Sequence, residues 1–244
     1  MRINQYLARC GMGSRRQVEK LVEDGRVAVN QMLIADLALR VDPECDVVSV
    51  DNTIVRPRAE HAVWMFNKPL GLLCTREDPG GRPTIFEHLA HLPSPFQAVG
   101  RLDRDTSGLL LITNDGYLAQ ALMHPKFEVP RYYRVVVEGR WQHDYAERLK
   151  NGVEMREGGT GKADVLQVET LDGSRVQLQL CLKRGKKREI RYSLQALQLK
   201  VVTLQRTGLA HLQLGALEAG ACRQLGAEEL AQLYLLIPPP AVQK

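Results

Sequence analysis

The order of the expected strands and helices constrains this fold more than any single motif does. Beyond residue 62, alternating or continuous apolar runs predict strands, and a 3.6-residue apolar period predicts helices. The strands are expected at 63–66, 72–74, 97–102, 109–113, 132–137, 164–169 and 176–182, and the helices at 117–123, 188–197 and 227–237. Because these elements show no strand–helix–strand rhythm, the sequence predicts an α+β fold rather than a doubly wound α/β fold.

The N-terminal residues predict a smaller unit of their own. An apolar helix face is formed by Ile3, Tyr6, Leu7 and Cys10. Gly11 is placed to end this helix, and Ser14 with Gln17 forms a capping box for a second helix that ends at Gly25. Short strands are then expected at 27–29, 33–34 and 47–50.

A polar stretch with a proline, Arg56–Glu60, separates this unit from the rest of the chain. The run Pro238–Pro240 marks the end of ordered structure in the same way. We therefore expect a first domain over 1–55, a linker over 56–61, a second domain over 62–238 and a tail over 239–244.

Composition and cysteine usage exclude several classes of protein. Of 244 residues, 44% are hydrophobic and 25% are charged, which is ordinary for a globular chain. The longest aliphatic runs, such as Leu109–Ile112, are far shorter than the about 20 residues of a membrane span. The polar N-terminus lacks the apolar block of a secretory signal. Five cysteines without paired spacing predict neither a metal site nor a disulfide framework, and free thiols fit the cytoplasm.

Two basic clusters suggest contact with a phosphate backbone. Residues 1–30 hold six basic and three acidic side chains, and Arg15, Arg16 and Lys20 lie off the apolar face of the second helix. In Lys183–Arg191, six of nine side chains are basic and one is acidic, an excess equal to the +5 of the whole chain. The alternative in both places is a solvated basic surface, which short charge runs commonly form.

The segment Gly100–Leu111 places Asp103 and Asp105 in a tight turn between two apolar strands. Loops held by a sheet commonly carry catalytic groups, although a polar hairpin turn is the alternative. A calcium loop shares the D-x-D spacing, but its later ligand positions are not matched here. The stretch Arg131–Arg134 interleaves two tyrosines with arginine, which suits either stacking on an unpaired base or packing within a sheet.

Together these segments resemble the RsuA/RluB-type family of ribosomal RNA pseudouridine synthases. Residues 1 to about 50 resemble its S4 RNA-binding domain, and residues from about 62 to 237 resemble its catalytic domain. The matching motifs are Ser14–Arg16, Asn67–Gly71, Gly100–Asp103 with Thr106–Leu109, Met123–Pro125, Tyr133 and Arg188–Arg191. The resemblance implies a small S4-type αβ domain linked to a larger catalytic domain built on a mixed or antiparallel sheet.

The resemblance also implies that the chain isomerises uridine to pseudouridine in RNA, without a cofactor or a metal. The family's essential aspartate corresponds to Asp103, its partner arginine to Arg191, and the tyrosine that stacks on the target base to Tyr133. Burial disfavours an ionised carboxylate, and a neighbouring guanidinium stabilises that charge. The base must be flipped out of the RNA first, and an adduct route and a glycal route both remain open.

Phosphate contacts are expected to offset the cost of flipping the base. The residues expected to contact phosphate near the cleft are Lys68, Arg101, Lys187 and Arg188. A second RNA-binding site is expected at Arg15, Arg16 and Lys20. Residues around Met123–Pro125 and Glu128–Val129 resemble the type that modifies one site in 23S RNA, and 16S RNA is the alternative target. A non-catalytic RNA-binding protein of ribosome assembly is the alternative of another class. We expect a cytoplasmic monomer that binds ribosomal RNA and no membrane.

Overall fold

The computed structural model describes residues 1–13, 15–57, 61–92 and 95–237. The chain divides into two compact units, Met1–His61 with Pro93–Phe96, and Ala62–Leu92 with Gln97–Lys244. Ser14 of the expected capping box, part of the expected linker and the expected tail lie outside the described residues. Within the described ranges, no helix is long and apolar enough to cross a membrane.

The smaller unit packs two helices on an antiparallel sheet. The helices are α1 (Ile3–Arg9) and α2 (Arg15–Glu23), and the strands, in sheet order, are β2 (Met32–Leu33), β1 (Val27–Val29), β3 (Val48–Val50) and β4 (Thr53–Ile54). The predicted apolar face of α1 is confirmed, because Ile3, Tyr6, Leu7 and Cys10 are all buried in one core with the sheet. Gly25 has a φ of 67°, which is the left-handed geometry that follows a helix end.

Two tight hairpins set the register of this small sheet. Asn30 and Gln31 link β1 to β2, and Asp51 and Asn52 link β3 to β4; all four residues have positive φ. Positive φ at both central residues is the geometry of a type I′ turn, which matches the twist of the strands it joins.

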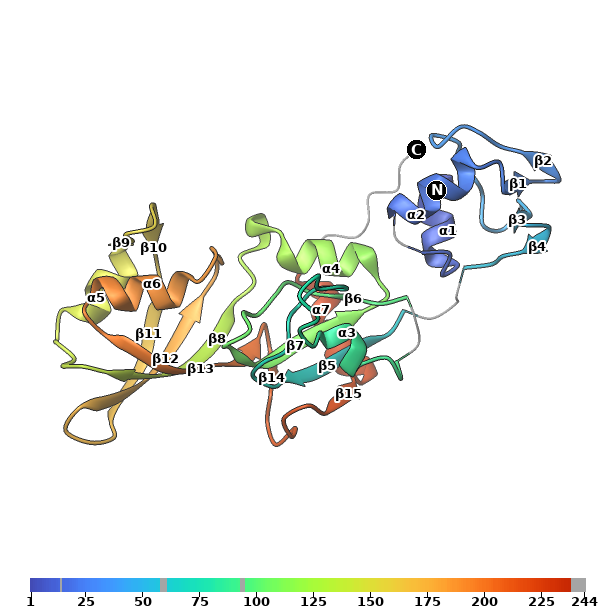
Figure 1. Ribbon diagram of the computed structural model, residues 1–244. Helices are drawn as coiled ribbons and strands as arrows, with labels where there is room; N and C mark the ends of the chain where they lie inside the picture. The colour runs from blue at the N-terminus through green and yellow to red at the C-terminus, as the bar shows by residue number, and fades with distance from the viewer. Residues whose placement is uncertain (14, 58–60, 93–94, 238–244) are drawn as a thin grey trace. The chain divides into compact units, whose positions relative to one another are not determined.

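The larger unit is built on one mixed sheet, which confirms the predicted α+β class (Figure 1). Among the described residues nine strands take part: β5 (Val63–Lys68), β6 (Gln97–Ala98), β7 (Ser107–Thr113), β8 (Arg131–Glu138), β11 (Asp164–Thr170), β12 (Arg175–Leu182), β13 (Lys200–Leu209), β14 (Leu212–Gln213) and β15 (Cys222–Gln224). The main order is β11-β12-β8-β13-β7-β5-β15, with β6 on β7 and β14 on β13. Only β13 and β7 pair in parallel within the described sheet.

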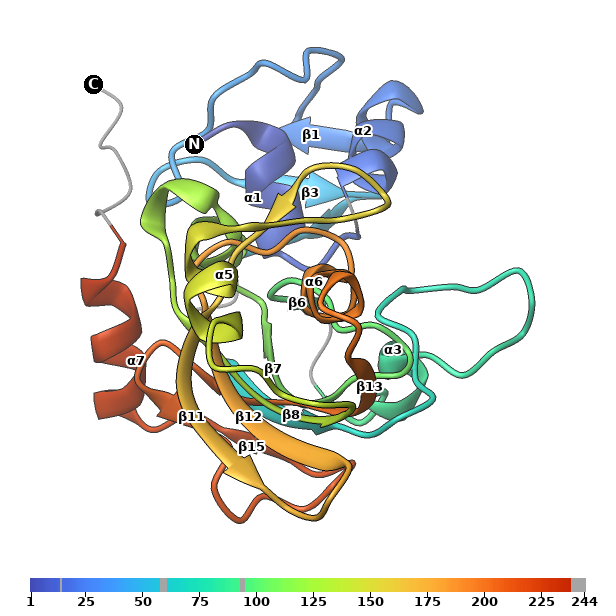
Figure 2. The same cartoon turned by 90° about the vertical axis from the view of Figure 1, so that its left-hand side faces the viewer.

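Helices cover the sheet at its two ends and create two cores. The helices are α3 (Ile85–His88), α4 (Gly116–Met123), the 3₁₀ turn η1 (Pro125–Phe127), α5 (Tyr145–Asn151), α6 (Glu189–Ala196) and α7 (Ala227–Leu235). The first core joins α4 and α7 to alternate residues of β5 and β7, and the second joins α5 and α6 to β8, β12 and β13. Figure 2 shows α5 and α6 on the same side of the curved strands, and Figure 1 shows the small pair β9 (Val153–Glu154) and β10 (Thr160–Gly161) next to them.

Two expected elements differ from the structure. The segment 72–74 forms only an isolated bridge, between Leu73 and Thr84, and β6 stops at Ala98 instead of reaching residue 102. In both places the backbone belongs to, or contacts, the loop that precedes β7 instead of continuing a strand. Leu102 N–H points to the sulfur of Cys74 at 3.4 Å, a contact that no strand ladder could make.

Candidate active site

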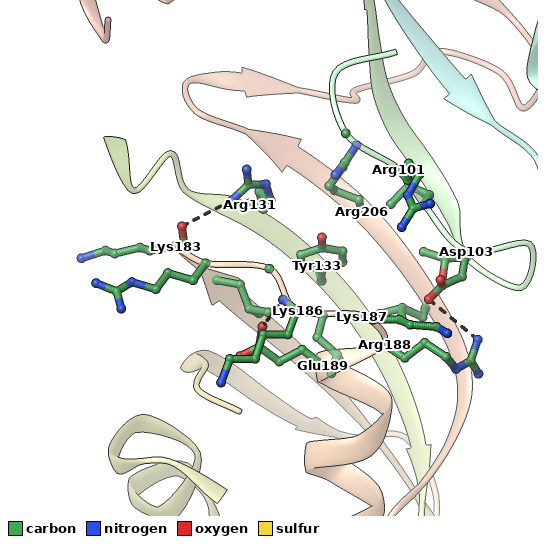
Figure 3. A pocket seen from close by; sticks show the side chains of 18 of the residues that line it. Arg101, Asp103, Arg131, Tyr133, Lys183, Lys186, Lys187, Arg188, Glu189 and Arg206 are labelled. Carbon is green, nitrogen blue, oxygen red and sulfur yellow. Dashed lines mark hydrogen bonds and ion pairs between the residues drawn. The ribbon is translucent and has the colours of Figure 1, made fainter. Parts of the chain in front are cut away.

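A cleft of about 310 Å³ opens between the loop before β7, strands β8 and β13, and the segment before α6 (Figure 3). This volume is at the lower end of the range for small-ligand sites. Most charged residues that line it are basic: Arg101, Arg131, Lys183, Arg184, Lys186, Lys187, Arg188 and Arg206, against Asp103 and Glu189. Such a surface attracts a polyanion and raises its local concentration.

The loop that carries Asp103 is held from below by a buried lysine. Lys68, at the end of β5, is 0% exposed, and its ammonium group donates to the backbone oxygens of Pro69 (3.0 Å), Asp103 (3.2 Å) and Thr106 (2.9 Å). Burial lowers the pKa of Lys68, and the nearby Cys74 and carboxylates partly oppose that shift. The loop therefore has a fixed path before any ligand binds.

The predicted phosphate contact of Lys68 is therefore wrong. A phosphate cannot reach an ammonium group that is fully buried and already donates to three carbonyl oxygens. An unpaired buried charge is costly, and the three carbonyls supply the polar partners that offset this cost. Lys68 therefore supports the backbone of the Asp103 loop instead of contacting RNA.

Two carboxylates and two arginines form one cluster at the mouth of this loop. Arg188 donates to both carboxylate oxygens of Asp105, at 3.1 and 3.0 Å, and its guanidinium lies 3.8 Å from Oδ2 of Asp103. Arg191 lies with Nε 3.2 Å from Oδ2 of Asp105 and donates from Nη2 to the Asp105 backbone oxygen at 2.6 Å. Arg188 therefore lies close to the carboxylates of both Asp103 and Asp105, whereas Arg191 contacts Asp105.

Burial and charge act in opposite directions on this cluster. Burial raises the pKa of Asp105, but the hydrogen bonds from Arg188 and the charge of Arg191 outweigh it and hold the pKa below its usual value. The Asp105 hydrogen bond raises the pKa of Arg188. Burial lowers the pKa of Arg191, whose side chain is only 13% exposed, and Asp105 and Asp103 partly offset this. Asp105 is therefore ionised at neutral pH and pairs with both guanidinium groups.

The expected pairing of Asp103 with Arg191 differs from the structure. Arg191 contacts Asp105, and the cation nearest to Asp103 among the described residues is Arg188, which we expected to contact phosphate. The side chain of Asp103 is 36% exposed and lines the cleft, whereas Asp105 does not line it. Asp105 thus holds the two guanidinium groups, and Asp103 keeps its oxygens toward the open cleft.

Tyr133 lies on the floor of the cleft, between the cluster and the basic segment (Figure 3). It stands on β8 opposite Leu180 of β12 and Arg206 of β13. Arg101 and Lys187 are exposed and line the same cleft, as expected for groups that contact phosphate. In the smaller unit, Arg16 and Lys20 are exposed on α2, while the side chain of Arg15 lies outside the described part of the chain.

A buried carboxylate shapes the basic segment Lys183–Arg188. Glu189 is 5% exposed and accepts hydrogen bonds from the backbone N–H groups of Lys186 (2.8 Å) and Lys162 (3.0 Å). Arg188 follows this turn with a φ of 54°, a left-handed geometry that is rare for a residue with a side chain. This backbone conformation immediately precedes α6, so the Arg188 side chain enters the cluster from a fixed point.

Sequence reasoning missed Glu189 and Arg206 as parts of this site. Glu189 lies in a charged run, where an exposed side chain is the ordinary expectation. Arg206 is 2% exposed in the middle of β13, a strand that was not predicted. Among the described residues, no group of three His, Cys, Asp or Glu side chains is arranged to hold a metal ion.

Comparison with known proteins gives matches over both units. Residues 62–196 match the RNA pseudouridylate synthase family, and residues 1–57 match the S4 domain. An uncharacterized RNA pseudouridine synthase of Aquifex aeolicus is 37% identical over 235 residues, which cover 96% of this chain and 94% of that protein. The ribosomal large subunit pseudouridine synthase B of Bacillus subtilis is 33% identical over 237 residues, 96% of each chain. A crystal structure of pseudouridylate synthase has a TM-score of 0.64 at 26% identity, over 96% of this chain and 99% of that one.

Proposed function

The chain belongs to the RNA pseudouridylate synthase family, and from this premise we propose that it isomerises one uridine of 23S ribosomal RNA with Asp103 as the nucleophile. The enzyme class and the RNA substrate follow from the family. The target is inferred from the relative in Bacillus subtilis, whose name refers to the large ribosomal subunit. The choice of Asp103 rests on its place in the cleft beside Arg188.

The cleft supports a mechanism in which a flipped uridine meets Asp103 and Tyr133. Tyr133 offers its ring on the floor for the base to stack on, and Asp103 faces the sugar from the loop. The Asp103 carboxylate then acts on the ribose or the base, the bond between C1′ and N1 breaks, and C1′ is rejoined to C5. The cations of Arg188 and Arg191 stabilise the carboxylate charge in a site from which RNA excludes water.

Exposed cations supply the affinity that offsets base flipping, which costs a few kcal/mol. Arg101 and Lys187 line the cleft, and we propose that they contact the phosphates next to the flipped nucleotide. The S4 unit provides a second binding site for the same RNA, formed by Arg15, Arg16 and Lys20. Two linked binding sites raise the overall affinity through effective concentration, even when each site alone binds weakly.

Mapping of pseudouridines in ribosomal RNA tests this proposal. In a strain that lacks the gene, we expect one pseudouridine of 23S RNA to be absent. The wild-type gene should restore it, and a gene with Asp103→Asn should not. A site lost from 16S RNA would correct the target, an unchanged map would refute the function, and restoration by Asp103→Asn would refute the assigned nucleophile.

A further inference from the structure

One guanidinium on the floor of the cleft is buried and only partly bonded. The side chain of Arg206 on β13 is 2% exposed, lines the cleft and donates from Nε to the backbone oxygen of Leu109 at 2.6 Å. Its Nη2 is buried and has no hydrogen-bond partner among the described residues. Leaving such a donor unbonded is unfavourable, so an acceptor that enters the cleft would recover that loss.

The position of Arg206 is fixed by close backbone packing. Arg206 pairs with Gly108 of β7, and a Cβ atom at Gly108 would lie within 2.2 Å of the Arg206 backbone oxygen. Only glycine admits this approach, and Gly108 also has a φ of 105°. The glycine of the Thr106–Leu109 motif thus places β13, and with it Arg206, beside the loop of Asp103.

Arg206 also stands next to the proposed stacking residue. It is directly opposite Tyr133 in the antiparallel pair of β13 and β8, and residues in that relation point to the same face of a sheet. Figure 3 shows both side chains on the floor of the cleft, with Arg101 and Asp103 beside them. The hydroxyl of Thr106 lines the same cleft and is likewise buried without a partner among the described residues.

A base, rather than a phosphate, fits this location. Under the proposed function the backbone phosphates contact Arg101 and Lys187, which are exposed, whereas Arg206 lines the cleft and is only 2% exposed. A uracil stacked on Tyr133 would bring a carbonyl oxygen to the floor, where a guanidinium can donate to it.

The reaction gives that contact a catalytic role. When the C1′–N1 bond breaks, its electron pair stays with the uracil ring and spreads over the two carbonyl oxygens. The ring then forms the C5–C1′ bond and loses the proton of C5. We infer that Arg206 Nη2 donates to a carbonyl oxygen of the flipped uracil and stabilises this negative charge, without giving up a proton. The inference rests on the proposed function.

Single-turnover rates of Arg206→Gln and Arg206→Lys on RNA with uridine or 5-fluorouridine at the target test the inference. Fluorine withdraws electrons and stabilises the departing base without help from the enzyme. Because fluorine blocks the final proton loss, the readout for both substrates is loss of the starting nucleoside. On uridine we expect Arg206→Gln to be about 100-fold slower, as for loss of one donor to a developing anion. Arg206→Lys, which keeps the charge, should be slowed less.

The substrate comparison separates a catalytic role from a structural one. We expect the deficit of each variant to shrink about tenfold on 5-fluorouridine, while the RNA dissociation constant changes less than about threefold. An equal deficit on both substrates, in variants whose thermal unfolding matches the wild type, would overturn the inference. So would a loss of affinity with a salt slope reduced by about one, which indicates a phosphate contact.

Arg101→Gln is the matched control. It should bind RNA more weakly, and any reduction of its single-turnover rate should be the same on uridine and on 5-fluorouridine. If Arg206→Gln fails to fold, Arg206→Lys decides the comparison alone. A wild-type enzyme that makes no pseudouridine would refute the proposed function instead, before any Arg206 variant is compared.

Discussion

The loop of Asp103 and the basic segment Lys183–Lys187 line the same cleft but are built in different ways. The loop is fixed by the fully buried Lys68, which donates to two of its backbone oxygens, those of Asp103 and Thr106, and to the backbone oxygen of Pro69. The basic segment keeps its side chains exposed. Its backbone is anchored through Glu189, and its side-chain contacts lie at the surface, from Lys186 to the Thr160 backbone oxygen and from Arg184 to Glu128. A group that must meet one reacting atom needs a rigid support, whereas charges that attract a polyanion act over several ångströms and need little.

This difference predicts that changes behind the loop reduce the rate of reaction, and that changes on the basic segment reduce RNA affinity. Apart from Asp103 itself, the largest effect is expected at Arg191. Arg191→Met removes a mostly buried cation beside the Asp105 carboxylate, so the single-turnover rate should fall about 100- to 1,000-fold, while RNA affinity changes little. Arg191→Lys should recover part of the rate, because it keeps the charge but loses the second contact. A rate close to that of the wild type in Arg191→Met would contradict the expectation that changes behind the loop reduce the rate of reaction.

Lys68→Met should come next. The three backbone oxygens lose their donor, and a displacement of the loop by about 1 Å can slow a reaction about 100-fold. We expect the thermal midpoint to fall as well, because buried acceptors are left unbonded. Lys150→Met, at an exposed position on α5, is the matched control and should change neither quantity. Reduced RNA affinity with an unchanged rate would instead support a phosphate contact for Lys68.

Asp105→Asn should have a smaller effect, about tenfold on the rate, because the two arginines lose the carboxylate that holds them but keep Asp103 nearby. The pKa of Asp105 is lowered in the fold, so its contribution to stability is complete above the unfolded pKa of about 4 and is lost as the pH falls through the lower folded pKa. Chemical denaturation at several pH values measures this. A stability difference from the wild type that grows below pH 4 would contradict the prediction.

The smallest effect is expected for Lys187→Ala. Lys187 is exposed and has no ion-pair partner within the described residues, so its loss should weaken RNA binding a few-fold and reduce the salt slope by about one. The rate at saturating RNA should not change. Filter binding at several salt concentrations gives the slope, and a lower saturating rate would place Lys187 in the reacting site.

Local patterns of the sequence were enough to predict much of the fold. The apolar face of α1, the glycine that follows α2 and the central run of β7 depend on neighbours in the chain, and the structure contains each of them. The α+β class followed from the order of the elements. The strand at 72–74 was wrong because this segment bends to meet Leu102, and only the folded chain brings that partner close.

The site was less predictable, because its key contacts join residues far apart in the sequence. Lys68 reads as an exposed cation until residues 35 and 38 positions later surround its ammonium group. Arg191 contacts Asp105 and not Asp103 because of the turn that precedes α6, in which Arg188 has a left-handed backbone conformation. The missed β13 brings Arg206 to the floor, and no local periodicity marks an arginine as buried.

The central claim is that Asp103 reacts and Asp105 holds the arginines. One measurement tests it directly: single-turnover formation of pseudouridine by Asp103→Asn and Asp105→Asn, at saturating RNA, with the dissociation constants measured in parallel. The account predicts that Asp103→Asn binds RNA within about threefold of the wild type but forms product at least about 10⁴-fold more slowly, whereas Asp105→Asn is slowed only about tenfold. Product formation by Asp103→Asn together with an inactive Asp105→Asn would contradict it.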